Sequence, residues 1–264
     1  MDAARARGRF PPRFVMEGGR SMARHMGMTE ARLTELLPAA SLYQYFLPSV
    51  LAADPSNFTR IESRLPQSFA LVRDKFSELE SHRQLVITTF HMSCLPLVPM
   101  LANVACTQLR TGPRHVIVAP RNRSWLETDS GRWVTEVCEV IVADTGGLRR
   151  LVAGLRDGSV ERLVTLVDGP HPPGNPGTRA LSGISPALGF RIGVLSRVLS
   201  MGIPVLPVLH YWQSERLAIE FGPLLTSPPA SREEGIDAVA GIIEGILRRH
   251  PEQWLNWPAA RLRT

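Results

Sequence analysis

The stretch EVIVADTGGLRRLVAGLRDGSVERLVTLVD, residues 139–168, decides the fold of this 264-residue chain. It begins with a short apolar run over 139–144, continues with an amphipathic stretch over 146–158, and closes with a second apolar run over 162–168. Short apolar runs indicate buried strands, and a glycine such as Gly158 commonly follows the last turn of a helix. The stretch therefore predicts a strand, a helix and a second strand, which is the repeating unit of α/β proteins.

The same alternation continues on both sides of this stretch. Further strands are predicted at 85–90, 115–120, 203–212 and 216–222. Further helices are predicted at 29–37, 41–53, 65–79, 189–202 and 231–250, and directly after His91. The helix over 231–250 opens with a serine cap and carries early acids and late bases, which suit the helix dipole. The first 25 residues, rich in arginine and glycine, predict a loose basic arm. We therefore expect one α/β domain over 1–264, built on a mixed, largely parallel sheet flanked by helices.

The chain is basic, with 30 Lys and Arg against 24 Asp and Glu, a net charge of +6, and Lys75 as its one lysine. A GC-rich genome explains such an arginine bias. An arginine-rich surface also suits acidic partners, namely anionic lipid, an acidic carrier protein or a phosphorylated substrate. No helix-turn-helix, RNP or zinc-finger pattern occurs, so we do not expect nucleic acid as a partner.

The three cysteines, Cys94, Cys106 and Cys138, lie in or beside apolar runs and lack metal-ligand spacing. They are expected to be reduced core residues of a cytoplasmic protein. The first 14 residues lack the apolar region of a secretory signal. The uncharged run over 36–53 contains two prolines, a glutamine and two serines, so it predicts core or interfacial helices rather than a membrane span.

Four polar elements follow predicted strand ends: His91, the PRNR stretch at 120–123, the DGP stretch at 168–170, and His210. The carboxyl ends of parallel strands share one edge of a sheet, and ligands of such sheets bind there. We therefore expect a site that collects these residues. The loop over 168–179, rich in proline and glycine, is either a lid over the site or a rigid connector.

Each of these residues has a structural and a functional interpretation. His91 either caps its strand through a backbone carbonyl or acts as a general base. Asp168 either caps the following turn, orients an imidazole, or binds a polar group of a substrate. Arg121 and Arg123, which flank Asn122, either hold a phosphate or phosphopantetheine or are solvated loop charges.

Other catalytic patterns are absent from the sequence. There is no Gly-x-Ser-x-Gly elbow, Walker loop or Rossmann fingerprint, which disfavours an ordinary α/β-hydrolase, a nucleotide hydrolase and a dinucleotide enzyme. No His-Glu-x-x-His or paired Cys-x-x-Cys motif occurs, so a dedicated metal site is not expected. Cys94 stands three residues after His91, but we expect it to point into the core rather than to act as a nucleophile.

Six segments resemble, in their order, motifs of one enzyme family. They are LVITTFHMSCLP, VIVAPRNR, GRWVTEVCEVIVADTGGLRRLVAGLRDGS, LVTLVDGPHPPG, LSGISPALGFRIGVLSRVLSMGIPVLPV and HPEQWLNWPAARLR. Over roughly residues 15–262 this order resembles the lipid A biosynthesis acyltransferases, the late lauroyl and myristoyl transferases of the lysophospholipid acyltransferase superfamily. The first segment is similar to a strand followed by the family's His-x-x-x-x-Asp/Glu motif.

The resemblance implies a glycerolipid-acyltransferase-like fold and acyl transfer to a hydroxyl or amine. The donor would be a thioester on acyl carrier protein or coenzyme A, with no metal, cofactor or covalent enzyme intermediate. His91 would take the proton of the acceptor, and backbone or arginine donors would stabilise the oxyanion. Arg121, Asn122, Arg123 and His210 are the candidate substrate-binding residues.

The sequence departs from the family pattern in two places. Pro96 stands where the family has its acid, and a proline cannot orient or stabilise an imidazole. Asp168, from the neighbouring strand end, is the preferred replacement. The alternatives are that His91 works alone, or that activity is lost and the protein binds acyl chains or an acyl-carrier partner. A thioesterase or esterase on the same scaffold is a third alternative.

The second departure is that the family's amino-terminal transmembrane helix is missing. We therefore expect a small-molecule or carrier-tethered acceptor in bacterial lipid or specialised-metabolite biosynthesis. The expected location is the cytoplasm, with peripheral contact at the inner membrane.

Overall fold

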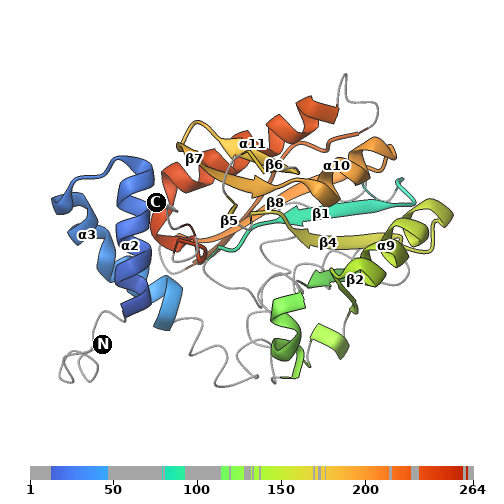
Figure 1. Cartoon of the computed structure of the whole chain (residues 1–264), viewed down its shortest axis with the longest axis horizontal. Helices are drawn as coiled ribbons and strands as arrows, with labels where there is room; N and C mark the ends of the chain where they lie inside the picture. Colours follow the sequence, from blue (N-terminus) through green and yellow to red (C-terminus); the bar gives the residue numbers. More distant parts are fainter. Residues whose placement is uncertain are drawn as a thin grey trace.

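A six-stranded sheet, in the order β3-β2-β4-β1-β8-β9, runs through the centre of the molecule (Figure 1). The strands cover Leu85–Thr89 (β1), Arg114–Val118 (β2), Glu139–Val142 (β3), Arg162–Leu166 (β4), Val205–Gln213 (β8) and Arg216–Phe221 (β9). The first five pair in parallel, whereas β9 runs antiparallel to β8. The prediction of a mixed, largely parallel sheet with flanking helices is therefore confirmed.

The computed structural model describes residues 13–46, 79, 81–92, 114–118, 120–127, 132, 134–136, 138–168, 170–171, 174–175, 177–213, 216–226, 232–257 and 260. Several sequence-based predictions lie outside the described residues. They are the helix after His91, nearly all of the helix over 65–79, the later part of the helix over 41–53, the serine cap at 231, Cys94, Pro96 and Cys106.

The unit between β3 and β4 forms as predicted. Helix α9 (Thr145–Asp157) begins after Asp144, whose side chain accepts a hydrogen bond from the Gly147 backbone N–H at 2.7 Å. It ends at Gly158, whose φ of 80° lies in the left-handed region that glycine adopts without strain. Gly147 permits a close approach, because a Cβ there would lie 1.8 Å from the carbonyl oxygen of Val142.

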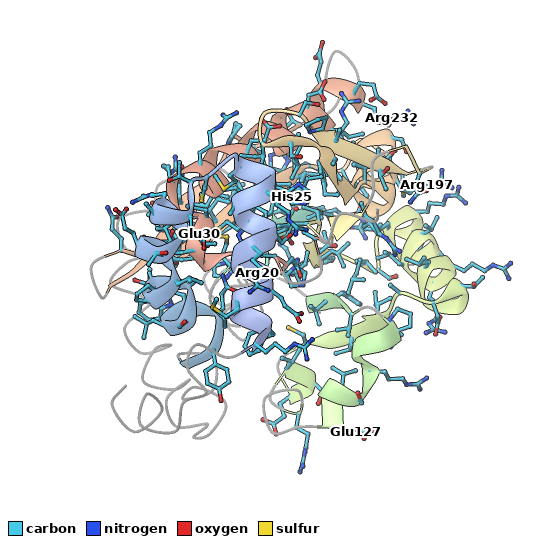
Figure 2. The ribbon with its side chains drawn as sticks, turned by 60° about the vertical axis from the view of Figure 1, so that its left-hand side comes forward. Arg20, His25, Glu30, Glu127, Arg197 and Arg232 are labelled. Atoms are coloured by element: carbon cyan, nitrogen blue, oxygen red, sulfur yellow. The ribbon has the colours of Figure 1, made fainter. Side chains whose placement is uncertain are left out.

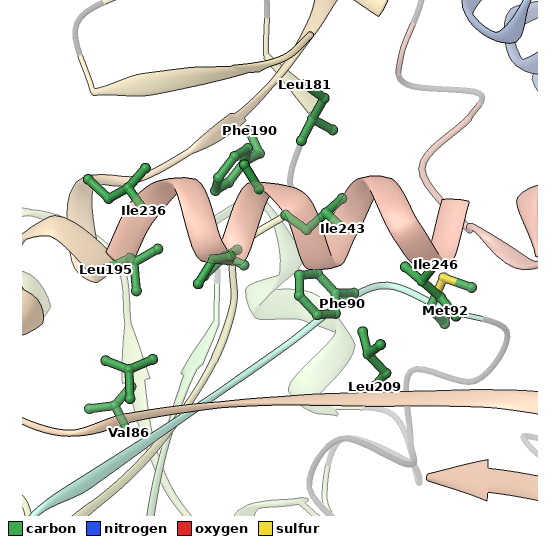
Figure 3. Close-up of a cluster of buried hydrophobic side chains, with 14 of the residues drawn as sticks. Val86, Phe90, Met92, Leu181, Phe190, Leu195, Leu209, Ile236, Ile243 and Ile246 are labelled. Atoms are coloured by element: carbon green, nitrogen blue, oxygen red, sulfur yellow. The ribbon is translucent and has the colours of Figure 1, made fainter. Parts of the chain in front are cut away.

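Helix α11 (Arg232–Arg249) covers one face of the central sheet (Figures 1 and 3). Its acidic first turn and basic last turn confirm the dipole pattern expected from the sequence. One stripe of the helix is buried, as its spacing of three and four residues requires: Ile236, Val239, Ala240, Ile243, Ile246 and Leu247. Figure 3 shows this stripe between Phe90 and Leu209 of the sheet and Phe190 and Leu181 on the other side.

A second, antiparallel sheet lies over the other side of α11, and the sequence did not predict it. Its order is β5-β7-β6, with β5 at Pro170–His171, β6 at Thr178–Leu181 and β7 at Ser185–Arg191. The loop predicted over 168–179 thus supplies β5 and the start of β6. The helix predicted over 189–202 begins later, as α10 at Gly193–Ser200, because the residues before it pair with β5 and β6.

The prediction of a loose arm over the first 25 residues is wrong from Arg13 onward. Arg13–Met26 form helix α2, which buries Val15 and Met22 and packs against α3 (Glu30–Ser41). A Cβ on Gly19 would lie 3.0 Å from Leu37 of α3, so this glycine permits tight helix packing instead of flexibility. Figure 2 shows His25 on the side of α2 that faces the rest of the molecule.

The remaining described elements are short. A π-helix covers Leu42–Phe46, and 3₁₀ helices cover Pro120–Glu127 (η2) and Pro251–Gln253 (η3). The Cys138 thiol is reduced and buried, as expected. None of the described helices combines the length and apolar character needed to cross a bilayer.

Candidate active site

The candidate site forms where the adjacent parallel strands β1 and β4 end. The two strands pair in register up to Thr89 with Leu166, so the residues two positions further on come opposite each other. Those residues are His91 and Asp168. The prediction that both lie past strand ends at one edge of the sheet is thereby confirmed, and the parallel register is its physical cause.

His91 and Asp168 make two direct hydrogen bonds. Nδ1 of His91 lies 2.7 Å from Oδ1 of Asp168, and the backbone N–H of His91 donates to Oδ2 at 2.8 Å. The Asp168 side chain is completely buried, whereas 20% of the His91 side chain is exposed. The carboxylate therefore fixes both the ring and the main chain of the histidine from inside the protein.

A third element completes the surroundings of Asp168. We call residues 251–257 the tryptophan segment. Its Trp254 donates the indole N–H to Oδ2 of Asp168 at 2.5 Å, and Asn256 donates its side-chain amide to the backbone oxygen of Asp168 at 3.0 Å. The Leu255 N–H donates to the backbone oxygen of His91 at 2.8 Å. The segment thus holds both members of the pair.

These contacts decide the ionisation of Asp168. Burial, the largest single influence, raises the pKa of this carboxyl group. The neighbouring His91 and the hydrogen bonds from His91 and Trp254 act in the opposite direction and outweigh burial, so the pKa lies below its ordinary value of 3.8. Asp168 is therefore an ionised carboxylate at neutral pH.

The ionised carboxylate also fixes the tautomer of His91. A carboxylate has only acceptor atoms, so the hydrogen bond between the rings of His91 and Asp168 requires a proton on Nδ1. The lone pair of the neutral imidazole is then on Nε2, which has no hydrogen-bond partner among the described residues. A partly exposed histidine in this tautomer, with a buried acid behind it, has the arrangement of a general base.

His210 lies inside the sheet rather than beyond it, which corrects the sequence-based prediction. It is the sixth residue of β8 and completely buried. Nδ1 lies 3.2 Å from the hydroxyl of Thr89, and Nε2 lies 3.2 Å from the backbone oxygen of Met92. With both ring nitrogens held by buried neighbours, His210 supports the backbone on either side of His91 and is not placed to bind a substrate.

The PRNR stretch follows the carboxyl end of β2 and belongs to η2. Strand β2 pairs with β4, so η2 begins at the same edge of the sheet as Asp168. The side chain of Arg123 is exposed, while those of Arg121 and Asn122 lie outside what the structure describes. Among the described residues, no group of three or more His, Cys, Asp or Glu side chains could hold a metal ion.

Trp254 and Asn256 are the site residues that sequence reasoning missed. The segment HPEQWLNWPAARLR had been singled out for its family resemblance alone, without a role for any of its residues. An indole 86 positions away from the aspartate it contacts gives no local signal in the sequence. The one available indication was two tryptophans close together in a polar, proline-containing stretch after the last predicted helix.

Comparison with known proteins leaves this site to be interpreted from its geometry. No model of a known protein family matches the chain. A search of curated proteins likewise finds no match.

Proposed function

We propose that the protein is an acyltransferase that moves an acyl group from a thioester to a hydroxyl or amine. The observation that carries this proposal is the contact of 2.7 Å between Nδ1 of His91 and Oδ1 of Asp168. It gives the histidine a buried anionic partner even though Pro96 stands where the resembled family has its acid. The donor would be an acyl group on a carrier-protein phosphopantetheine or on coenzyme A.

In the proposed reaction, Nε2 of His91 takes the proton from the acceptor as its oxygen or nitrogen attacks the thioester carbonyl carbon. Asp168 stabilises the imidazolium that forms. When the tetrahedral intermediate collapses, the carbon–sulfur bond breaks and the leaving sulfur receives the proton from His91. Arg121 and Arg123 are proposed to contact the phosphate of the donor, since they follow a strand that ends at the same edge of the sheet.

Two other functions use the same residues differently. In a thioesterase or esterase, water replaces the acceptor and His91 keeps its role. In a protein that only binds acyl chains or an acyl carrier, the pair serves no chemistry. A histidine enclosed by apolar side chains would favour binding alone, whereas this one contacts a buried carboxylate and is partly exposed. We therefore place catalysis first.

The decisive experiment compares the wild type with His91→Ala. Acyl-carrier and coenzyme A thioesters would be incubated with hydroxyl and amine acceptors, and products identified by mass spectrometry. We expect an acylated acceptor from the wild type and a loss of about 10³-fold or more in the variant. His82→Ala is the matched control, because His82 precedes β1 at the opposite edge of the sheet.

Each outcome of this experiment separates two of the functions. Free acid as the sole product would replace the transferase by a hydrolase. Turnover that survives His91→Ala would refute His91 as the base. Binding of the thioester without any turnover would favour the non-catalytic alternative. The proposed setting remains the cytoplasm, with peripheral contact at the inner membrane and a small-molecule or carrier-tethered acceptor.

A further inference from the structure

Trp254 makes a contact that packing alone does not require. Its ring is 1% exposed, so the indole N–H needs a partner inside the protein. That partner is Oδ2 of Asp168, the same oxygen that accepts the backbone N–H of His91. The other oxygen of the carboxylate is thereby left to the imidazole. The indole thus divides the two oxygens of Asp168 between distinct tasks.

The tryptophan segment is itself firmly anchored. The side-chain amide of Gln253 pairs with both the N–H and the C=O of Trp212 in β8, each at 2.8 Å. Gln44 donates to the backbone oxygen of Glu252 at 2.8 Å. Next to the pair, Trp254 forms an antiparallel bridge with Met92, the residue after His91. The indole is therefore held in place independently of Asp168, as a positioning group must be.

We propose that Trp254 is a positioning residue that fixes the carboxylate of Asp168 in the orientation that His91 uses. Without the indole N–H, the buried carboxylate loses a donor and gains rotational freedom about its last bond. The imidazole then loses part of its support in the Nδ1-protonated form. The catalytic part of this inference rests on the proposed function, whereas the effect on the Asp168–His91 contact does not.

The test compares Trp254→Phe with the wild type. Phenylalanine keeps an aromatic ring but has no N–H. We expect kcat to fall about tenfold to a hundredfold, as for the loss of one hydrogen bond to a charged group, while KM stays within about twofold. In the protein without substrate, we expect the NMR signal of the His91 Nδ1 proton to shift upfield and to exchange faster with water.

Trp257→Phe is the matched control. Trp257 is equally buried and also donates its indole N–H, but to the backbone oxygen of Pro251 at 2.6 Å. Its removal costs stability in the same way without taking a donor from Asp168. We expect Trp257→Phe to keep kcat and the His91 proton signal close to those of the wild type. Equal effects of the two variants would show a structural role for Trp254 and would overturn the inference.

A second variant covers the case in which Trp254→Phe does not fold. Replacing Trp254 by β-(3-benzothienyl)alanine keeps the shape of the indole but puts sulfur in place of the N–H. The same changes in kcat and in the His91 signal are expected, and an unchanged His91 signal would refute the inference. If the wild type transfers no acyl group, the proposed function fails, yet the His91 signal still decides whether Trp254 positions Asp168.

Discussion

At the scale of single residues, the feature that governs the candidate site is a fully buried carboxylate with three hydrogen-bond donors. Asp168 receives the ring N–H and the backbone N–H of His91 and the indole N–H of Trp254. Burying a charge is costly unless it is paired and hydrogen-bonded, and here both conditions are met. The residue is therefore a specific device for supporting an imidazole rather than a simple turn cap.

Asp168→Asn provides the test of this device. The asparagine keeps the shape of the side chain, but its amide nitrogen is a donor and cannot accept a proton from Nδ1 of His91. The imidazole then favours the tautomer with its proton on Nε2, which is useless as a base. We expect acyl transfer to fall about 10³- to 10⁴-fold, measured as kcat on the thioester substrate that the wild type uses.

The control for this variant is Asp157→Asn, which changes an exposed carboxylate at the end of α9. It should retain wild-type kcat. A fully active Asp168→Asn variant would mean that His91 does not rely on this carboxylate.

At the scale of elements, the sequence predicted most of the central sheet and the helices with clear boundaries. Helix α9 has an aspartate cap and a terminal glycine, and α11 has a buried stripe with charged ends. The errors fall on β7 and α2. The apolar run before α10 has helical periodicity, but its residues are held in an antiparallel sheet whose other strands come from a proline-rich loop. Pairing between distant segments overrides local preference in this way.

The turn into α9 gives a prediction at this scale. Gly146→Ala and Gly147→Ala make the same chemical change at adjacent positions. A Cβ at Gly147 would lie 1.8 Å from the carbonyl oxygen of Val142, whereas the nearest atom to a Cβ at Gly146 is 3.5 Å away. We expect Gly147→Ala to lower the free energy of unfolding by about 1–3 kcal/mol and Gly146→Ala to change it by less than about 0.5 kcal/mol.

Urea denaturation followed by circular dichroism would measure both effects. Equal destabilisation by the two alanines would contradict the packing of Gly147 against β3.

At the scale of the whole molecule, the site depends on three segments that are far apart in the chain. His91 and Asp168 are separated by 77 positions, and Trp254 follows Asp168 by another 86. Helix α2 joins this arrangement, because Ser21 and His25 bond to the backbone oxygen of Ala260 at 2.7 and 2.8 Å. The two ends of the described chain thus meet beside the site, so global unfolding and loss of the site are expected to coincide.

The ionisation of Asp168 therefore makes a contribution to global stability that depends on pH. Its pKa is lowered on folding from the ordinary value of 3.8, so the native state favours the ionised form. The contribution is present above that value and is lost as the pH falls through the lower pKa of the folded state. We expect the stability advantage of the wild type over Asp168→Asn to be constant near neutral pH and to shrink in acid below about pH 4.

This prediction is measured by urea denaturation at a series of pH values. Glu136→Gln, an exposed position, controls for the change in net charge. An advantage that stays the same down to pH 2 would show that Asp168 is not stabilised as an anion in the folded protein.

The sequence by itself determined the α/β class, the strands of the central sheet, and the two residues most closely involved in the proposed chemistry. It could do so because apolar runs and helix ends are local signals, and because His91 and Asp168 each directly follow a strand. Only the tertiary structure decided which residues meet. The parallel register sets His91 against Asp168, burial inside β8 removes His210 from the substrate-binding candidates, and the tryptophan segment brings Trp254 to the carboxylate. These contacts join residues dozens of positions apart, and no local pattern specifies them.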